Sequence, residues 1–95
     1  MFVVLLKFSA NKAEAPTHMA DHNSWLAQGF DENIFLVAGS LKPSQGGAIL
    51  AHNCTLEALQ NRVNADPFVQ EDIVTAEILE IAPSKVDERF SFLLD

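Results

Sequence analysis

The sequence predicts an α+β fold with the element order β-α-β-β-α-β. Four short runs are rich in apolar β-forming residues and are bounded by turn residues, at positions 2–8, 34–38, 48–51 and 73–81. Between them lie two stretches in which apolar residues recur with helical spacing. This order is the split-βαβ or ferredoxin-like plan, with one antiparallel sheet and both helices on one face.

The first helix is expected over residues 16–30, because a proline suits its first turn and a glycine marks its end. Met19, Leu26 and Phe30 fall on one side of this helix, which predicts that they form its core stripe. A neighbouring strip, on which side chains three and four positions apart can touch, contains His18, Asp21, His22 and Trp25. We therefore expect the catalytic or ligand-binding side chains of this helix to lie on this strip.

Thr55 can cap the second helix, which is expected to bury a stripe of Leu56, Leu59 and Val63 and to stop before Pro67. We expect residues 1–82 to form the domain and residues 83–95 to form a C-terminal extension. The extension is expected to be a short helix from a capping box at Ser84, packed on the domain or on a dimer partner.

The first two strands are apolar on both faces, with the sequences FVVLLKF and IFLVA. An antiparallel sheet that is wetted on one face should alternate apolar and polar residues, so something must cover the second face. A second copy of the same sheet is the economical cover, because two-fold pairing is the commonest closed assembly. We therefore expect a homodimer packed sheet to sheet.

The composition limits the possible partners. The chain has 95 residues, 48% of them hydrophobic, with no apolar run long enough to span a membrane. A net charge of −7 without a basic cluster argues against nucleic acid. The single cysteine, Cys54, excludes an internal disulfide and suits the reducing cytoplasm. We expect a cytoplasmic protein that binds neither membrane nor nucleic acid.

Three short segments in this order, residues 15–19 (APTHM), 36–40 (LVAGS) and 64–68 (NADPF), resemble the motifs of the YCII-related proteins. The resemblance covers about residues 1–82 and implies a ferredoxin-like dimeric α+β barrel. It also implies that His18 and Asp66 are the matching histidine and aspartate, from which enzymatic function has been suspected. Relatives in aromatic degradation suggest dehydrochlorination or lactone isomerisation. The arginine often found three residues before the histidine is Ala15 here.

His18 lies near the positive end of its helix dipole, which favours a neutral imidazole that can accept a proton. The alternative is a histidine packed at a subunit seam. In the functional interpretation, Asp66 would orient His18 or favour its charged form. In the structural interpretation, Asp66 would accept a hydrogen bond from the backbone N–H of Phe68 in an Asp-Pro turn.

His18 and His22 have the spacing of a two-histidine metal site, and Asp21 adds an oxygen donor nearby. The only other histidine, His52, is distant, so we expect no metal.

If both helices begin at the same end of the sheet, His18 and Asp66 lie roughly 16 Å apart, the length of an 11-residue helix. Either the partner subunit then brings Asp66 across, or Asp66 is structural and His18 works with Asp21 or a water molecule.

We expect a cofactor-free isomerase or lyase that moves protons on a small organic acid or ring compound. One alternative is a non-catalytic small-molecule-binding or accessory domain that uses the same pocket. A structural module acting through its acidic surface is another, and it predicts no concave pocket near Trp25. The residues expected around the pocket are His22, Trp25, Gly39, Ser40, Pro67 and Phe68.

Overall fold

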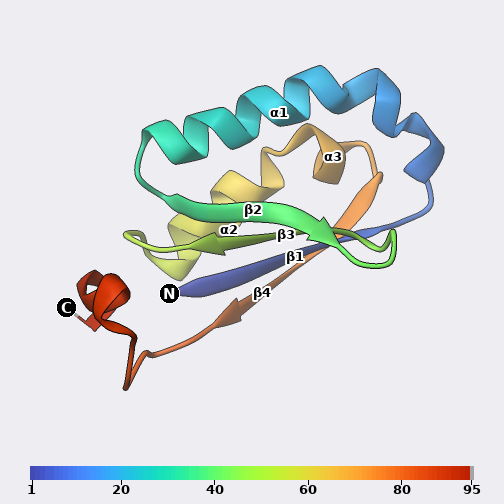
Figure 1. Cartoon of the computed structure of the whole chain (residues 1–95). Coiled ribbons are helices and arrows are strands. Elements are labelled where there is room, and N and C mark those ends of the chain that lie inside the picture. The colour runs from blue at the N-terminus through green and yellow to red at the C-terminus, as the bar shows by residue number, and fades with distance from the viewer. Residues whose placement is uncertain (95) are drawn as a thin grey trace.

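The computed structural model describes residues 1–94 and confirms the predicted ferredoxin-like α+β fold (Figure 1). The strands are β1 (Phe2–Phe8), β2 (Phe35–Leu41), β3 (Gly46–Ala51) and β4 (Val74–Glu80). The helices are α1 (Ala15–Asp31), α2 (Leu56–Asn64) and α3 (Pro67–Gln70), with 3-10 helices η1 (Lys12–Glu14) and η2 (Glu88–Leu94). Two elements inside the domain were not predicted from the sequence: the short 3-10 helix η1, and α3, which begins at the proline that was expected only to end α2.

The four strands form one antiparallel sheet in the order β2-β3-β1-β4, and α1, α2 and α3 lie on the same side of it (Figure 1). Val4 on β1 pairs with Ile49 on β3 and with Ile78 on β4, so these side chains share one face. Every second residue of β1, beginning at Phe2, is buried against the helices up to Leu6. The core therefore lies between the sheet and the helix layer.

The two main helices run in opposite directions. Since β1 and β3 are antiparallel and each is followed by a helix that returns over the sheet, α1 and α2 start at opposite ends (Figure 1). The expectation that both begin at the same end was wrong for this reason. The start of α1 consequently lies at the end of α2, where α1 packs on α3.

The buried stripe of α1 is also different from the predicted one. His22, Trp25 and Gly29 are the buried residues of this helix, whereas Met19 and Phe30 are 42% and 41% exposed. A Cβ atom at position 29 would overlap the ring of Phe35, so only glycine lets β2 approach α1 this closely. This contact orients the helix so that the strip with His22 and Trp25, not the Met19 stripe, faces the core.

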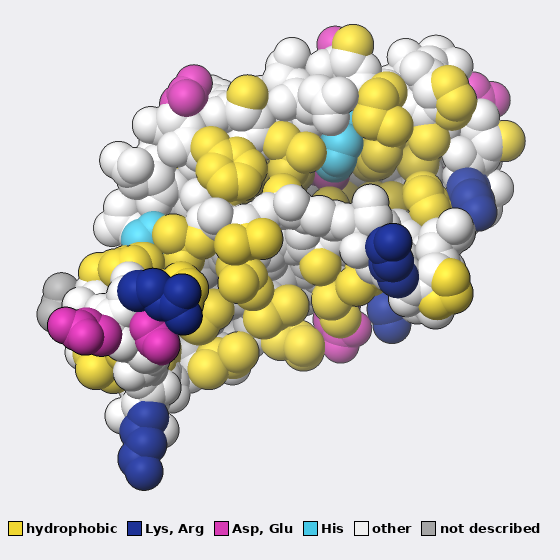
Figure 2. Space-filling model, in the orientation of Figure 1, with side chains coloured by type: hydrophobic (Ala, Val, Ile, Leu, Met, Phe, Trp, Pro, Cys, Tyr) yellow, Lys and Arg dark blue, Asp and Glu magenta, His cyan; other side chains and the backbone are white. Residues whose placement is uncertain are grey.

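The sheet face opposite the helices is apolar and open. Val37 on β2 and Leu79 on β4 are 51% and 44% exposed, and Leu50 and Val3 pair with each other between them. Hydrophobic side chains are visible along the sheet on the side away from α1 (Figure 2). A large exposed apolar surface of this kind marks an interaction site.

The C-terminal extension projects from the end of β4 (Figure 1). Its helix η2 begins four residues later than Ser84, after Asp87, whose carboxylate accepts the N–H of Arg89. The helix is of the 3-10 type and is interrupted by non-helical dihedral angles at Phe90. Within residues 1–94, no helix combines the length and the apolar character needed to cross a membrane.

Candidate functional site: a buried histidine–aspartate pair

His22 and Asp66 form a buried hydrogen-bonded pair. The Nδ1 atom of His22 lies 2.8 Å from Oδ1 of Asp66, and the two residues are 9% and 0% exposed. His22 comes from the second turn of α1, and Asp66 lies between the end of α2 and the start of α3. The opposite directions of α1 and α2 bring these two positions together within one subunit.

The surroundings of Asp66 fix the direction of this hydrogen bond. Asp66 caps α3, and its Oδ1 accepts the backbone N–H of Phe68 at 3.0 Å, as expected for the Asp-Pro turn. Because Oδ1 is an acceptor for that N–H, Nδ1 of His22 acts as a second donor to it. A neutral His22 then carries its lone pair on Nε2. The other oxygen, Oδ2, is buried without a hydrogen-bond partner in the described part of the chain.

Two aromatic rings hold the imidazole in place. The ring of Phe68 stacks on His22 with centroids 4.0 Å apart and an interplanar angle of 4°. Trp25 stacks less closely, at 5.8 Å, and its own Nε1–H donates to the carbonyl of Arg62 at 3.0 Å. Rotation of the His22 ring would disrupt both stacking and the bond to Asp66. The pair is therefore preorganised.

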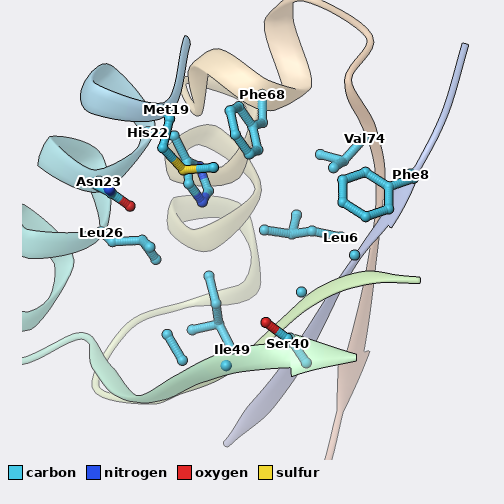
Figure 3. Close-up of a pocket in the computed structure, with 15 residues that line it drawn as sticks. Leu6, Phe8, Met19, His22, Asn23, Leu26, Ser40, Ile49, Phe68 and Val74 are labelled. Carbon is cyan, nitrogen blue, oxygen red and sulfur yellow. The ribbon is translucent and has the colours of Figure 1, made fainter. Parts of the chain in front are cut away.

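His22 lines a cavity of about 300 Å³ between α1 and the sheet (Figure 3). Its polar lining side chains are His22 and Asn23 from α1 and Ser40 from β2, which lies across the hollow from them (Figure 3). The larger apolar lining residues are Leu6, Phe8, Met19, Leu26, Ile49, Phe68 and Val74. This is an apolar pocket with a few convergent polar groups, which is typical of a small-molecule site.

The structure places the predicted site residues as follows. Gly39, Ser40, Phe68 and His22 line the cavity, Trp25 stands behind His22, and Pro67 begins α3. His18 is half-buried and does not line the cavity. The structure thus brings Asp66 to His22 and not to His18, because His18 lies one helical turn nearer the start of α1.

Trp25 lines a second hollow with Arg62 and Cys54. The alternative of a structural module acting through its acidic surface predicted no concave pocket near Trp25, and this expectation was wrong. Burial raises the pKa of the Cys54 thiol, an effect that the nearby charges of Arg62 and the N-terminus oppose. A protonated thiol is a poor nucleophile, so Cys54 has no evident chemical role.

Sequence patterns missed the polar lining residue Asn23, most of the apolar residues that line the cavity, and the short helix α3. The Asp66-Pro67 sequence could have predicted α3, since aspartate is a preferred N-cap and proline is favoured at the first helical position. Among residues 1–94, no three His, Cys, Asp or Glu side chains come close enough to hold a metal ion. His18, Asp21 and His22 thus form no such cluster.

Fold and site together define a ferredoxin-like α+β domain with a buried histidine–aspartate pair beside an apolar cavity. The chain belongs to the YCII-related family, because residues 1–83 match the model of the YCII-related domain.

Among solved structures, the chain is similar to 5-chloro-2-hydroxyhydroquinone dehydrochlorinase from Burkholderia phenoliruptrix, solved in complex with 2,5-dihydroxybenzoquinone. The TM-score is 0.69, and the match covers 85% of this chain and 93% of the other. The sequence identity is 13%, so this similarity establishes the shared fold. No functionally curated protein matches the sequence significantly.

Proposed function

We propose that the protein is an enzyme that moves a proton on a small ring compound, in an isomerisation or an elimination. His22 is the general base and acid, and Asp66 is its positioning partner. The observation that carries the proposal is the buried His22–Asp66 hydrogen bond at the wall of an apolar cavity. This assignment moves the proton-transfer role expected for His18 to the neighbouring histidine.

The geometry supports a simple proton-transfer scheme. Nε2 of His22 takes a proton from a ring carbon next to a carbonyl, and the Asp66 carboxylate stabilises the imidazolium through Nδ1–H. The electron pair of the broken C–H bond forms a C=C bond. In an isomerisation the carbonyl oxygen takes up the charge and His22 returns the proton elsewhere. In an elimination the same electron pair expels a leaving group such as chloride. Ser40 and Asn23 are placed to hydrogen-bond the oxygen.

The size of the cavity and the structural relative support a ring compound as substrate. A volume of about 300 Å³ is at the lower end of the range for ligand pockets and suits a single small ring. The similar dehydrochlorinase acts on a chlorinated hydroxyhydroquinone and was solved with a quinone. We infer that the same class of compound fits between His22 and Ser40 here.

Exchange of ring protons in D₂O tests this proposal without knowledge of the natural substrate. The probe is 1,4-cyclohexanedione, an uncharged ring compound whose C–H signals next to the carbonyls can be followed by proton NMR at neutral pH. We expect the folded protein to accelerate the exchange over buffer and over heat-denatured protein. If the probe shifts the His22 resonances without faster exchange, the protein is a binding domain that uses the same cavity.

We further propose that the protein is a homodimer packed through the open sheet face. The exposed Val37 and Leu79 side chains support this assembly, as does the gain in core that a small chain obtains from pairing. Two-fold packing would cover the apolar face that the helices leave open.

Val37→Glu is expected to convert the dimer to a monomer, because a charge would be buried between the paired sheets. Light scattering after size-exclusion chromatography measures the mass. Leu56→Glu is the control, since Leu56 is 38% exposed on α2, on the helical side of the sheet. A wild-type protein that remains monomeric at high concentration would contradict the dimer.

A further inference from the structure

A third hollow, here called the lysine hollow, adjoins the cavity at the end of the sheet that carries the turn between β2 and β3. It is lined by Lys12 and Lys42 together with three residues that also line the cavity, Phe8, Ser40 and Gly46. A molecule that fills the cavity next to His22 can therefore extend past these shared residues toward the two lysines. Lys and Arg side chains are visible near this end of the molecule (Figure 2).

Lys12 is held near the shared boundary. Its Nζ atom lies 4.7 Å from the centroid of the Phe8 ring, within the range of a cation–π contact. Phe8 lines both the cavity and this hollow, so the ammonium group of Lys12 lies beside a residue that the two share.

The lysines also differ from the arginines in their ion pairs. Arg62 is paired with Glu32, and Arg89 with Asp87. None of the salt bridges in residues 1–94 involves Lys12 or Lys42. Their charges are thus available to a ligand.

The cavity beside His22, unlike the lysine hollow, has no lysine or arginine among the described residues that line it. The buried Asp66 carboxylate lies directly behind His22. In a protein with a net charge of −7, an anionic group placed deep in this cavity would be repelled. A ligand that carries a negative charge must therefore direct it outward.

We propose that Lys12 and Lys42 form an anion-binding subsite, which accepts the carboxylate of a ring acid whose ring lies in the cavity beside His22. The inference rests on the proposed function for the position of the ring, and it narrows the substrate class to cyclic or aromatic carboxylates. In this arrangement the Phe8 side chain contacts the ring of the ligand on one side and the ammonium group of Lys12 on the other. The ring and the carboxylate of the ligand are therefore recognised together.

A matched pair of probes tests the subsite. The probes are para-hydroxybenzoate and para-hydroxybenzamide, which share their ring and shape but differ in charge at neutral pH. We expect the wild-type protein to bind the carboxylate roughly 3- to 10-fold more tightly, as two partly exposed ion pairs allow. Chemical-shift titration by NMR gives both affinities, and added salt should reduce the difference.

The double variant Lys12→Gln/Lys42→Gln should bind both probes equally, with the affinity for the amide unchanged. Lys85→Gln is the control, because Lys85 lies in the C-terminal extension and lines neither the cavity nor the lysine hollow. Equal binding of both probes by the wild type, or a preference that survives the double substitution, would overturn the subsite and leave the His22 site intact. Binding of neither probe near Phe8 and His22 would count against both proposals.

Discussion

His22→Gln is expected to slow proton exchange on the ring probe by about 10²- to 10⁴-fold, the usual contribution of general acid–base catalysis. Glutamine can keep one hydrogen bond to Asp66, but it has no nitrogen that accepts a proton near neutral pH. The measurement is the NMR exchange rate in D₂O, with ligand affinity determined in parallel. We expect slower proton exchange, with an affinity for the ring probe close to that of the wild type.

His18→Gln is the matched control for this experiment. The residue type, the helix and the substitution are the same, but His18 neither contacts Asp66 nor lines the cavity. We expect exchange within about twofold of the wild-type rate, below the scale of a catalytic contribution. The reverse outcome, with His18→Gln slow and His22→Gln fast, would return the catalytic role to His18.

Asp66→Asn separates the charge of the carboxylate from its shape. The amide oxygen can still accept the N–H of Phe68 and cap α3, so the fold should be retained. Without the negative charge, the imidazolium that forms on His22 is less stabilised, and exchange should slow. An unchanged rate would make Asp66 purely structural.

Gly29→Ala is expected to destabilise the protein by about 1–3 kcal/mol, although alanine is favoured over glycine in a helix by about 1 kcal/mol. The added Cβ would overlap the buried ring of Phe35, so α1 and β2 would have to move apart. Urea denaturation followed by circular dichroism measures the free energy of unfolding. The melting temperature should fall by roughly 4–8 °C per kcal/mol in a domain of this size.

Gly39→Ala is the control for this substitution. No heavy atom lies within 4 Å of the position that its Cβ would take, so its unfolding free energy should change little. If Gly29→Ala were as stable as the wild type, the close packing of Phe35 on α1 would not hold in solution. Displacement of α1 would also shift His22, so the same variant should lose proton exchange.

The type and order of the elements could be predicted from the sequence, because they depend on local patterns. The strand β1 is apolar except for Lys7 and has its predicted bounds, and Thr55 caps α2 by accepting a hydrogen bond from the N–H of Ala58. The motif segments likewise predicted the YCII-related family, which the match over residues 1–83 confirms. Asp66, Gly39, Ser40 and Phe68 were recognised as candidates from the same segments.

The tertiary structure alone decided which histidine meets Asp66. That contact joins positions 44 residues apart, and it depends on the directions of α1 and α2 and on the rotation of α1 about its axis. The rotation is set where Phe35 packs against the bare backbone of Gly29, a contact that no local pattern specifies. Helical periodicity places His18 and His22 on one strip, and only packing against the sheet and α3 distinguishes them.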